Sequence, residues 1–194
     1  KLLLSSSASV YGNPDKIPIS EKCLVTPLSV YAKSKFFMEE IVKDWSHLND
    51  NRKVIILRYF NPAGNHYSGE IGEVSRHDQS NLFPSILKVL DKKKKYFNIY
   101  GNDLDTKDGS SIRDYIHVSD LAKVHVSCLE YFNEMQKCDV FNIGSGIGTS
   151  VKEIIEKIEH TLKKQIPIKI CDFRDGEMPV SIASIKKANK LLKW

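Results

Sequence analysis

The strongest constraint on the fold is the alternation of short apolar runs with longer segments of helical pattern. The run KVIILRYF at 53–60 is β-branched, apolar and of strand length, and the Asn-Pro-Ala-Gly sequence after it ends the strand. Runs at 1–5 and 139–144 have the same character. Such continuous apolar runs are typical of strands buried on both faces. The chain therefore predicts an α/β fold built on a parallel sheet.

The remaining elements follow from the same patterns. Further strands are predicted at 96–101, 112–118 and 166–173. The first helix is predicted at 27–48, with Thr26 as its capping residue and Pro27 in its first turn. Further helices are predicted at 80–91, 119–134, 150–162 and 181–192.

The composition excludes several classes of protein. The chain has 194 residues, of which 41% are apolar and 27% charged, as expected for a globular protein with a substantial core. Much of the net charge of +5 comes from one lysine run at 92–95, which has no interleaved aromatic residues and no second basic cluster. We predict a solvated loop there and no nucleic-acid partner. No apolar run reaches the length of about 18 residues that a membrane helix needs.

The cysteines are widely spaced and form no Cys-x-x-Cys pair. This spacing argues against a zinc site and against a disulfide framework, and it favours a reducing compartment. We expect a cytoplasmic protein that holds no metal. The chain opens directly on the apolar run at 1–5 and closes within a helical pattern, so we also expect it to be an internal piece of a longer protein.

The sequence SVYAKSK at 29–35 places Tyr31 and Lys35 one helical turn apart. They are either an acid–base couple, or a tyrosine at the edge of the core beside a lysine that extends to water. A tyrosine base needs its pKa lowered by about three units from about 10, which requires roughly 4 kcal/mol of phenolate stabilisation. A neighbouring ammonium in a partly desolvated site can supply it. The predicted helix puts these residues on one stripe: Tyr31, Lys35, Met38, Val42 and Trp45.

A glycine-rich loop, Gly144 to Gly148, lies between a predicted strand and a predicted helix, as in dinucleotide-binding folds. Its spacing is Gly-x-Gly-x-Gly, and no acidic residue follows about 20 positions further on. Ser150 and Glu153 instead have the spacing of a helix capping box. We predict that the loop starts a helix and does not hold a cofactor phosphate.

A series of motifs in chain order resembles the UDP-glucose 4-epimerases of the extended short-chain dehydrogenase/reductase family: SSSASVYG, YAKSK, LRYFNPAG, NLFP, IYGND, DGSSIRDYIHVSDLA and FNIGSGIGTSV. The resemblance covers nearly the whole chain. It implies that 1–60 is the carboxyl-side part of a Rossmann-type NAD-binding domain whose amino-terminal half, with the glycine loop for NAD, is absent. It implies that 61–194 is mainly a smaller α/β domain for the UDP-sugar, with about 111–130 as a candidate to return to the first domain.

The resemblance implies epimerisation at carbon 4 of a UDP-sugar through a 4-keto intermediate. Tyr31 resembles the base that takes the proton of the 4-hydroxyl while hydride passes to NAD. Lys35 resembles the residue that holds the nicotinamide ribose and lowers the tyrosine pKa, and Ser7 the residue that bridges substrate and tyrosine. The keto sugar then rotates and takes the hydride back on its other face, which regenerates NAD.

Binding residues are implied in the same way. Phe60 falls at a nicotinamide contact, and Ser181 at a position bordering the sugar pocket, where a small side chain accompanies acceptance of UDP-GalNAc and UDP-GlcNAc. A homodimer formed through a pair of helices, one of them 27–48, is also implied. The other implied contacts with the UDP-sugar come from Asn61, Asn81, Leu82, Tyr100, Arg113, Arg174 and Glu177, the arginines at the pyrophosphate and the glutamate at the uridine ribose.

Two alternatives stay open. A nucleotide-sugar dehydratase or decarboxylase needs an added acid just before the Val-Tyr-Gly sequence, where this chain has Ala8 and Ser9, so that alternative is disfavoured. The other is a non-catalytic protein that only binds a nucleotide sugar. The presence of Ser7, Tyr31 and Lys35 together favours an enzyme, because a binding protein has no evident need for all three.

Overall fold

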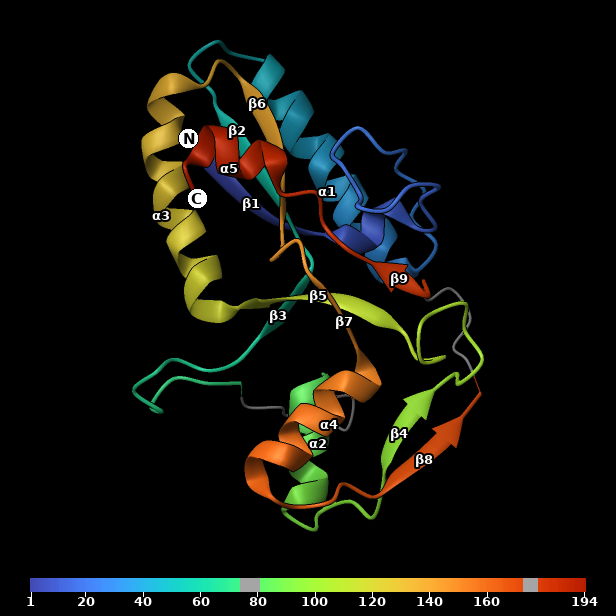
Figure 1. The fold of residues 1–194 in the computed structure, drawn as a ribbon. Coiled ribbons are helices and arrows are strands. Elements are labelled where there is room, and N and C mark those ends of the chain that lie inside the picture. The colour runs from blue at the N-terminus through green and yellow to red at the C-terminus, as the bar shows by residue number, and fades with distance from the viewer. Residues whose placement is uncertain (74–80, 173–177) are drawn as a thin grey trace.

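The upper half of the molecule in Figure 1 is built on a parallel sheet. Its strands are β1 (Leu2–Ser7), β2 (Val54–Tyr59) and β6 (Cys138–Ile143), hydrogen-bonded in the order β1-β2-β6. The predicted α/β fold with a parallel sheet is confirmed. The structure is a computed structural model and describes residues 1–73, 81–172 and 178–194.

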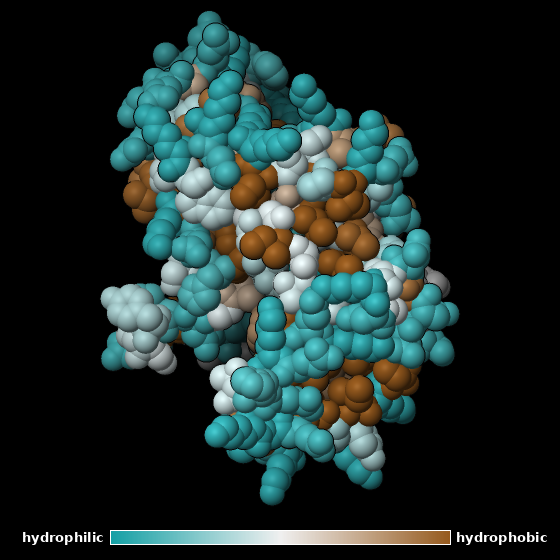
Figure 2. All heavy atoms as spheres, in the orientation of Figure 1, coloured by the Kyte–Doolittle hydropathy of each residue, from teal (hydrophilic) through white to brown (hydrophobic). Residues whose placement is uncertain are grey.

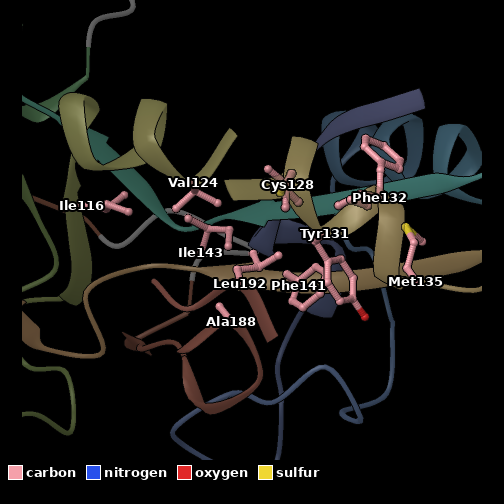
Figure 3. Packing of buried hydrophobic residues seen from close by; sticks show 12 residues of the cluster. Ile116, Val124, Cys128, Tyr131, Phe132, Met135, Phe141, Ile143, Ala188 and Leu192 are labelled. Carbon is pink, nitrogen blue, oxygen red and sulfur yellow. The ribbon is translucent and has the colours of Figure 1, made fainter. Parts of the chain in front are cut away.

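Helices cover both faces of this sheet. Because side chains alternate along a strand, Val54 and Ile56 of β2 face one side, where they meet Val42 and Trp45 of α1 (Val30–His47). The alternate residues of β2, Ile55 and Leu57, face the opposite side, towards α3 (Val118–Glu134) and α5 (Lys186–Leu192). Figure 3 shows that second layer, in which side chains from α3 and α5 meet those of β6. Its labelled members include Val124, Cys128, Tyr131, Phe141, Ile143, Ala188 and Leu192.

The lower half of Figure 1 holds a second apolar cluster, which is joined to the first sheet by a set of crossing strands. β5 is central to the crossing strands: β3 and β9 pair with it in parallel and β7 antiparallel. In the lower cluster, two parallel strands, β4 and β8, pack with two helices. The bounds are β3 (Asn61–Ala63), α2 (Leu82–Leu90), β4 (Phe97–Tyr100), β5 (Ile112–His117), β7 (Gly148–Ser150), α4 (Val151–Leu162), β8 (Ile168–Cys171) and β9 (Val180–Ser181).

The chain thus returns to the first sheet after entering the lower half. Residues 118–143 and 186–192 pack with strands β1 and β2, although they lie far from them in sequence. The predicted division into 1–60 and 61–194 stays a prediction.

Most predicted elements appear within a few residues of their expected bounds, and the capping box of Ser150 and Glu153 is present at the start of α4. All four cysteines are free in the structure. Within the described parts of the chain, no helix combines the length and apolar character needed to cross a bilayer.

The start of the first helix was predicted wrongly. The Thr26 hydroxyl donates to the Tyr11 carbonyl at 2.8 Å. It therefore stabilises the preceding loop and does not cap the helix. The helix begins after Ser29, whose side chain accepts from the Ala32 amide at 3.1 Å. The choice between two capping residues depended on a contact to Tyr11, which is distant in sequence.

The helix predicted at 181–192 is also shorter than expected. Residues 180–181 form β9 instead, and the next residues are held in extended pairing with Ile19. The Ile19 amide donates to the Ile182 carbonyl at 2.8 Å, and the Ser184 amide donates to the Ile19 carbonyl at 2.8 Å. Because this pairing occupies the backbone up to Ser184, the helix α5 begins only at Lys186.

The helix α1 buries a different line of residues from the predicted stripe. Val42 and Trp45 pack against the sheet as an apolar stripe should, but Tyr31 and Met38 are 57% and 42% exposed. The fully buried residues of α1 lie on a neighbouring line, two helical turns apart. They are Ala32, Glu39 and Ser46.

Candidate active site

The carboxyl end of β1 presents a serine as a hydrogen-bond donor. Ser7 caps the short 3-10 helix η1 (Ala8–Tyr11), and its Oγ accepts from the Ser9 amide at 3.2 Å and from Ser9 Oγ at 3.0 Å. A hydroxyl has two acceptor lone pairs and one donor hydrogen. With both lone pairs used by Ser9, the remaining capacity of Ser7 is to donate its own proton.

Gly12 makes the turn that follows Ser7 possible. Its φ is +61°, and an added Cβ would lie 2.1 Å from the Thr26 carbonyl oxygen. Only glycine fits both the left-handed backbone and this close approach. The Val-Tyr-Gly sequence therefore fixes how the loop after β1 turns towards the start of α1.

Tyr31 and Lys35 stand at the start of α1, which packs against β1 and η1. The Lys35 Nζ lies 5.8 Å from the centre of the Tyr31 ring and donates to the Ser5 carbonyl at 3.0 Å. Lys35 therefore reaches to the carboxyl end of β1, contrary to the interpretation of a lysine that only extends to water. Tyr31 is 57% exposed, which leaves its hydroxyl accessible to a ligand.

A cavity of about 530 Å³ runs between this end of the sheet and the lower half of the molecule. Its wall includes Ser9, which is hydrogen-bonded to Ser7. It also includes Ser29, which lies two residues before Tyr31. Its size is typical of a site for a small molecule. Most of the predicted substrate contacts line this one cavity: Asn61, Asn81, Leu82, Tyr100 and Arg113.

Arg113 ties the cavity wall to the neighbouring segment. Its Nη1 donates to its own neighbour, the Ile112 carbonyl, at 3.0 Å and to the Pro179 carbonyl at 3.3 Å. Ser181 is the strand partner of Arg113 in the pairing of β9 with β5, and it is only 4% exposed. The structure thus brings Ser181 next to the cavity through the backbone of Arg113.

Two further predicted contacts with the substrate, Arg174 and Glu177, lie outside the described residues. Phe60 is 7% exposed and packs in a cluster with Ala8 and Tyr11. It also lines a second cavity of about 710 Å³, which shares the residues Asn61, Asn81 and Leu82 with the first.

The cavity has wall residues that the sequence motifs did not assign. Asn98 lies two residues before Tyr100 on β4, and Tyr115 lies two residues after Arg113 on β5, so each pair points to one face of its strand. This alternation is the signal that could have found them. Burial raises the pKa of Tyr115 to about 12, against the opposing charge of Arg113, so this side chain stays neutral. Other wall residues that the motifs did not assign include Ser9, Ser85, Ser111 and Met178.

The amides of the glycine-rich loop bind the side-chain carboxylate of Asp114. Asp114 is fully buried, and its Oδ1 accepts from the Ser145 amide at 2.6 Å and from Ser145 Oγ at 2.7 Å. Its Oδ2 accepts from the Gly146 amide at 2.9 Å and from the Ala183 amide at 3.0 Å. The Ser145 and Gly146 amides, which a cofactor phosphate at this loop would need, are therefore occupied by Asp114.

Comparison with known proteins agrees with this arrangement. The sequence profile of the NAD dependent epimerase/dehydratase family matches residues 1–144. The chain belongs to this family. Among members of the family with curated names, a UDP-glucose 4-epimerase of Cyamopsis tetragonoloba is 44% identical over the whole chain, which spans 55% of the length of that protein.

Solved structures of epimerase/dehydratase family members match the fold closely. A UDP-glucose 4-epimerase from Stenotrophomonas maltophilia, with bound NAD and formylated UDP-arabinopyranose, gives a TM-score of 0.95 at 36% identity. The enzyme from Bifidobacterium longum, in complex with NAD+ and UDP, gives 0.93 at 39% identity. Both cover all of this chain, and this chain covers 58% of each.

Proposed function

We propose that this chain carries the catalytic and substrate-binding residues of an NAD-dependent epimerase that acts at carbon 4 of a UDP-sugar. The observation that carries the proposal is the cavity of about 530 Å³. Its wall includes Ser9, which is hydrogen-bonded to Ser7, Ser29, which lies two residues before Tyr31, and Arg113. A nucleotide sugar placed there has its sugar at the proton-transfer groups and its diphosphate at a guanidinium, which suits phosphate oxygens.

The residues present fit NAD at the carboxyl end of β1, the edge at which open parallel sheets bind ligands. Lys35 places an ammonium there, and an ammonium has three donor hydrogens, of which one is used by the Ser5 carbonyl. The others suit ribose hydroxyls. When bound, NAD supplies the group that accepts a hydride from carbon 4 and returns it. The loop at 144–148 is not part of this site, because Asp114 uses its amides.

The proton steps are assigned to residues of this chain. Tyr31 takes the proton of the sugar 4-hydroxyl, helped by the positive charge of Lys35 near its ring. Ser7, with its lone pairs occupied by Ser9, donates a hydrogen bond to the phenolate or to the sugar oxygen. When the other epimer forms, the same groups return the proton to the sugar oxygen in the reverse order. Asn61, Asn81, Leu82 and Tyr100 hold the sugar nucleotide along the cavity wall, and Arg174, Glu177 and Phe60 remain proposed contacts.

We infer a second copy of the protein as the partner and the cytoplasm as the compartment, with no nucleic acid involved. The support for self-association is an apolar line on the outer face of α1, at helical spacing. Figure 2 shows apolar groups gathered in the region where Figure 1 places α1 and the adjoining loop. The line consists of Val30, Phe37, Ile41 and Leu48, which are 86%, 61%, 66% and 77% exposed.

The direct test is conversion of UDP-galactose to UDP-glucose with added NAD, read by chromatography of the nucleotide sugars. It is run on the chain itself and on a protein of the relatives' full length that contains it. We expect conversion by the full-length protein. A full-length protein that binds UDP but converts neither sugar would overturn the epimerase proposal and favour the non-catalytic alternative.

A second prediction concerns the range of sugars. Ser181 is small and adjoins Arg113, so we expect the full-length protein to interconvert UDP-GlcNAc and UDP-GalNAc as well as the hexoses. Ser181→Tyr should lower kcat/KM for the N-acetylated pair by about tenfold or more relative to the hexose pair, since added bulk removes room for the acetamido group. Ser181→Cys, which adds little volume, is the matched control. An unchanged ratio of the two rates in Ser181→Tyr would contradict the assignment.

A further inference from the structure

A buried ion pair links the helix that carries Tyr31 and Lys35 to the sheet. Glu39 of α1 is fully buried and Arg58 of β2 is 3% exposed. The Arg58 Nε donates to Glu39 Oε1 at 3.0 Å, and Nη2 donates to Oε2 at 2.6 Å. Two parallel hydrogen bonds between a guanidinium and a carboxylate fix both distance and orientation. The pair therefore sets where α1 lies on β2, one helical turn beyond Lys35.

The same carboxylate also holds β1. Ser6, which immediately precedes Ser7, is 2% exposed, and its Oγ donates to Glu39 Oε1 at 2.5 Å. On the other side of Ser7, the Arg58 guanidinium lies 4.7 Å from the centre of the Tyr11 ring in η1. Ser6, one residue before Ser7, and Tyr11, four residues after it, are thus linked to one carboxylate on α1, Ser6 directly and Tyr11 through Arg58.

Holding a helix on a sheet does not require such a pair. Apolar contacts serve that purpose elsewhere on α1, where Val42 and Trp45 pack against Ile56. Replacing a buried ion pair by apolar residues of similar volume is often neutral for stability or better. What directional hydrogen bonds add, and apolar contacts do not, is a fixed register between helix and strand.

We propose that Glu39 is a positioning residue: its hydrogen bonds to Ser6 and Arg58 hold Tyr31 and Lys35 in register with Ser7. Glu39 itself is fully buried and does not line the cavity. The catalytic consequence rests on the proposed function, whereas the positional effect on Lys35 does not. Small displacements of reacting groups cost rate steeply, so loss of this register lowers kcat more than binding.

The test compares stability with turnover in the full-length protein. Glu39→Gln leaves the Arg58 charge unpaired, and we expect a lower melting temperature and a kcat reduced about 100-fold, with KM for the UDP-sugar changed by less than about threefold. The double variant Glu39→Leu with Arg58→Met fills the space with apolar atoms. We expect its melting temperature to return towards that of the parent while its kcat stays low.

A control ion pair, partly exposed, lies on the opposite face of the same sheet. Lys187 Nζ donates to Asp139 Oδ1 there, away from α1. The variant Asp139→Leu with Lys187→Met should keep kcat within about twofold of the parent. If kcat of the Glu39–Arg58 double variant recovered together with its melting temperature, Glu39 would be a structural residue only and the proposal would be overturned.

A second readout needs no turnover and is made on the chain as it stands. The rate at which an amine-reactive acylating reagent modifies Lys35 is measured by peptide mass spectrometry, with exposed Lys123 as the internal reference. We expect the rate at Lys35 to rise several-fold in the double variant, because the hydrogen bond to the Ser5 carbonyl depends on the register. A raised rate at Lys35, together with a full-length protein that shows no epimerase activity, would support the positioning role and reject the proposed function. An unchanged rate would overturn the positioning role.

Discussion

Replacing Tyr31 with phenylalanine is expected to lower kcat for UDP-galactose by about 10³-fold, within the range that a general acid–base group contributes. The change removes a single oxygen from a side chain that is 57% exposed, so neither the core nor the helix α1 loses packing. The ring that stands 5.8 Å from the Lys35 Nζ is kept. What disappears is the only part of the side chain that can take a proton.

The measurement is kcat and KM for the sugar together with UDP affinity by calorimetry, on the NAD-loaded full-length protein. UDP affinity and melting temperature should match the parent, because Arg113 and the rest of the cavity wall are untouched. Tyr96→Phe is the matched control: this tyrosine is 42% exposed, precedes β4 and lies outside the cavity wall. A Tyr31→Phe enzyme that kept more than about a tenth of the parent kcat would remove Tyr31 as the base.

The parts of the fold that sequence predicts well are those whose cause is local. The run at 53–60 is apolar on both faces and became β2, which is buried on both faces. The capping box at Ser150 and Glu153 needs only residues three apart, and it is present. Thr26 and the segment at 181–184 were misjudged because their backbone and side-chain partners, Tyr11 and Ile19, are far away in sequence.

The candidate site divides in the same way. Helical spacing predicts that Tyr31 and Lys35 are neighbours, which they are, whereas their catalytic role stays a prediction. The motifs marked five of the residues that line the cavity. Glu39 was missed because a glutamate in a helix pattern is normally assigned to the solvated face. Its burial depends on Arg58, a residue of another element whose position opposite it follows only from the packing of α1 on β2. Tertiary partners of this kind leave no periodic signal in the sequence.

The largest expected effect on stability comes from Asp114→Asn. The carboxylate is fully buried and each of its oxygens accepts two hydrogen bonds. An asparagine must turn an amide NH₂ towards one of these pairs of donors. If it faces the Gly146 and Ala183 amides, two buried N–H groups lose their acceptor and meet another donor. At about 1–3 kcal/mol for each of the two orphaned groups, we expect a loss of about 2–6 kcal/mol. For a chain of this size that lowers the melting temperature by roughly 10 °C.

Thermal unfolding followed by circular dichroism tests this, with Asp120→Asn as the matched control. Asp120 is half exposed and pairs with Lys123 on the surface, so its loss should cost under about 1 kcal/mol. Asp114 accepts hydrogen bonds from the Ala183 amide and from the amides of the loop at 145–146. The variant should also weaken UDP binding, because Arg113 and its strand partner Ser181 lie next to Asp114 and Ala183. If Asp114→Asn and Asp120→Asn had the same melting temperature, the stability of the glycine-rich loop would not depend on the Asp114 carboxylate. Its amides would then again be candidates for an external phosphate.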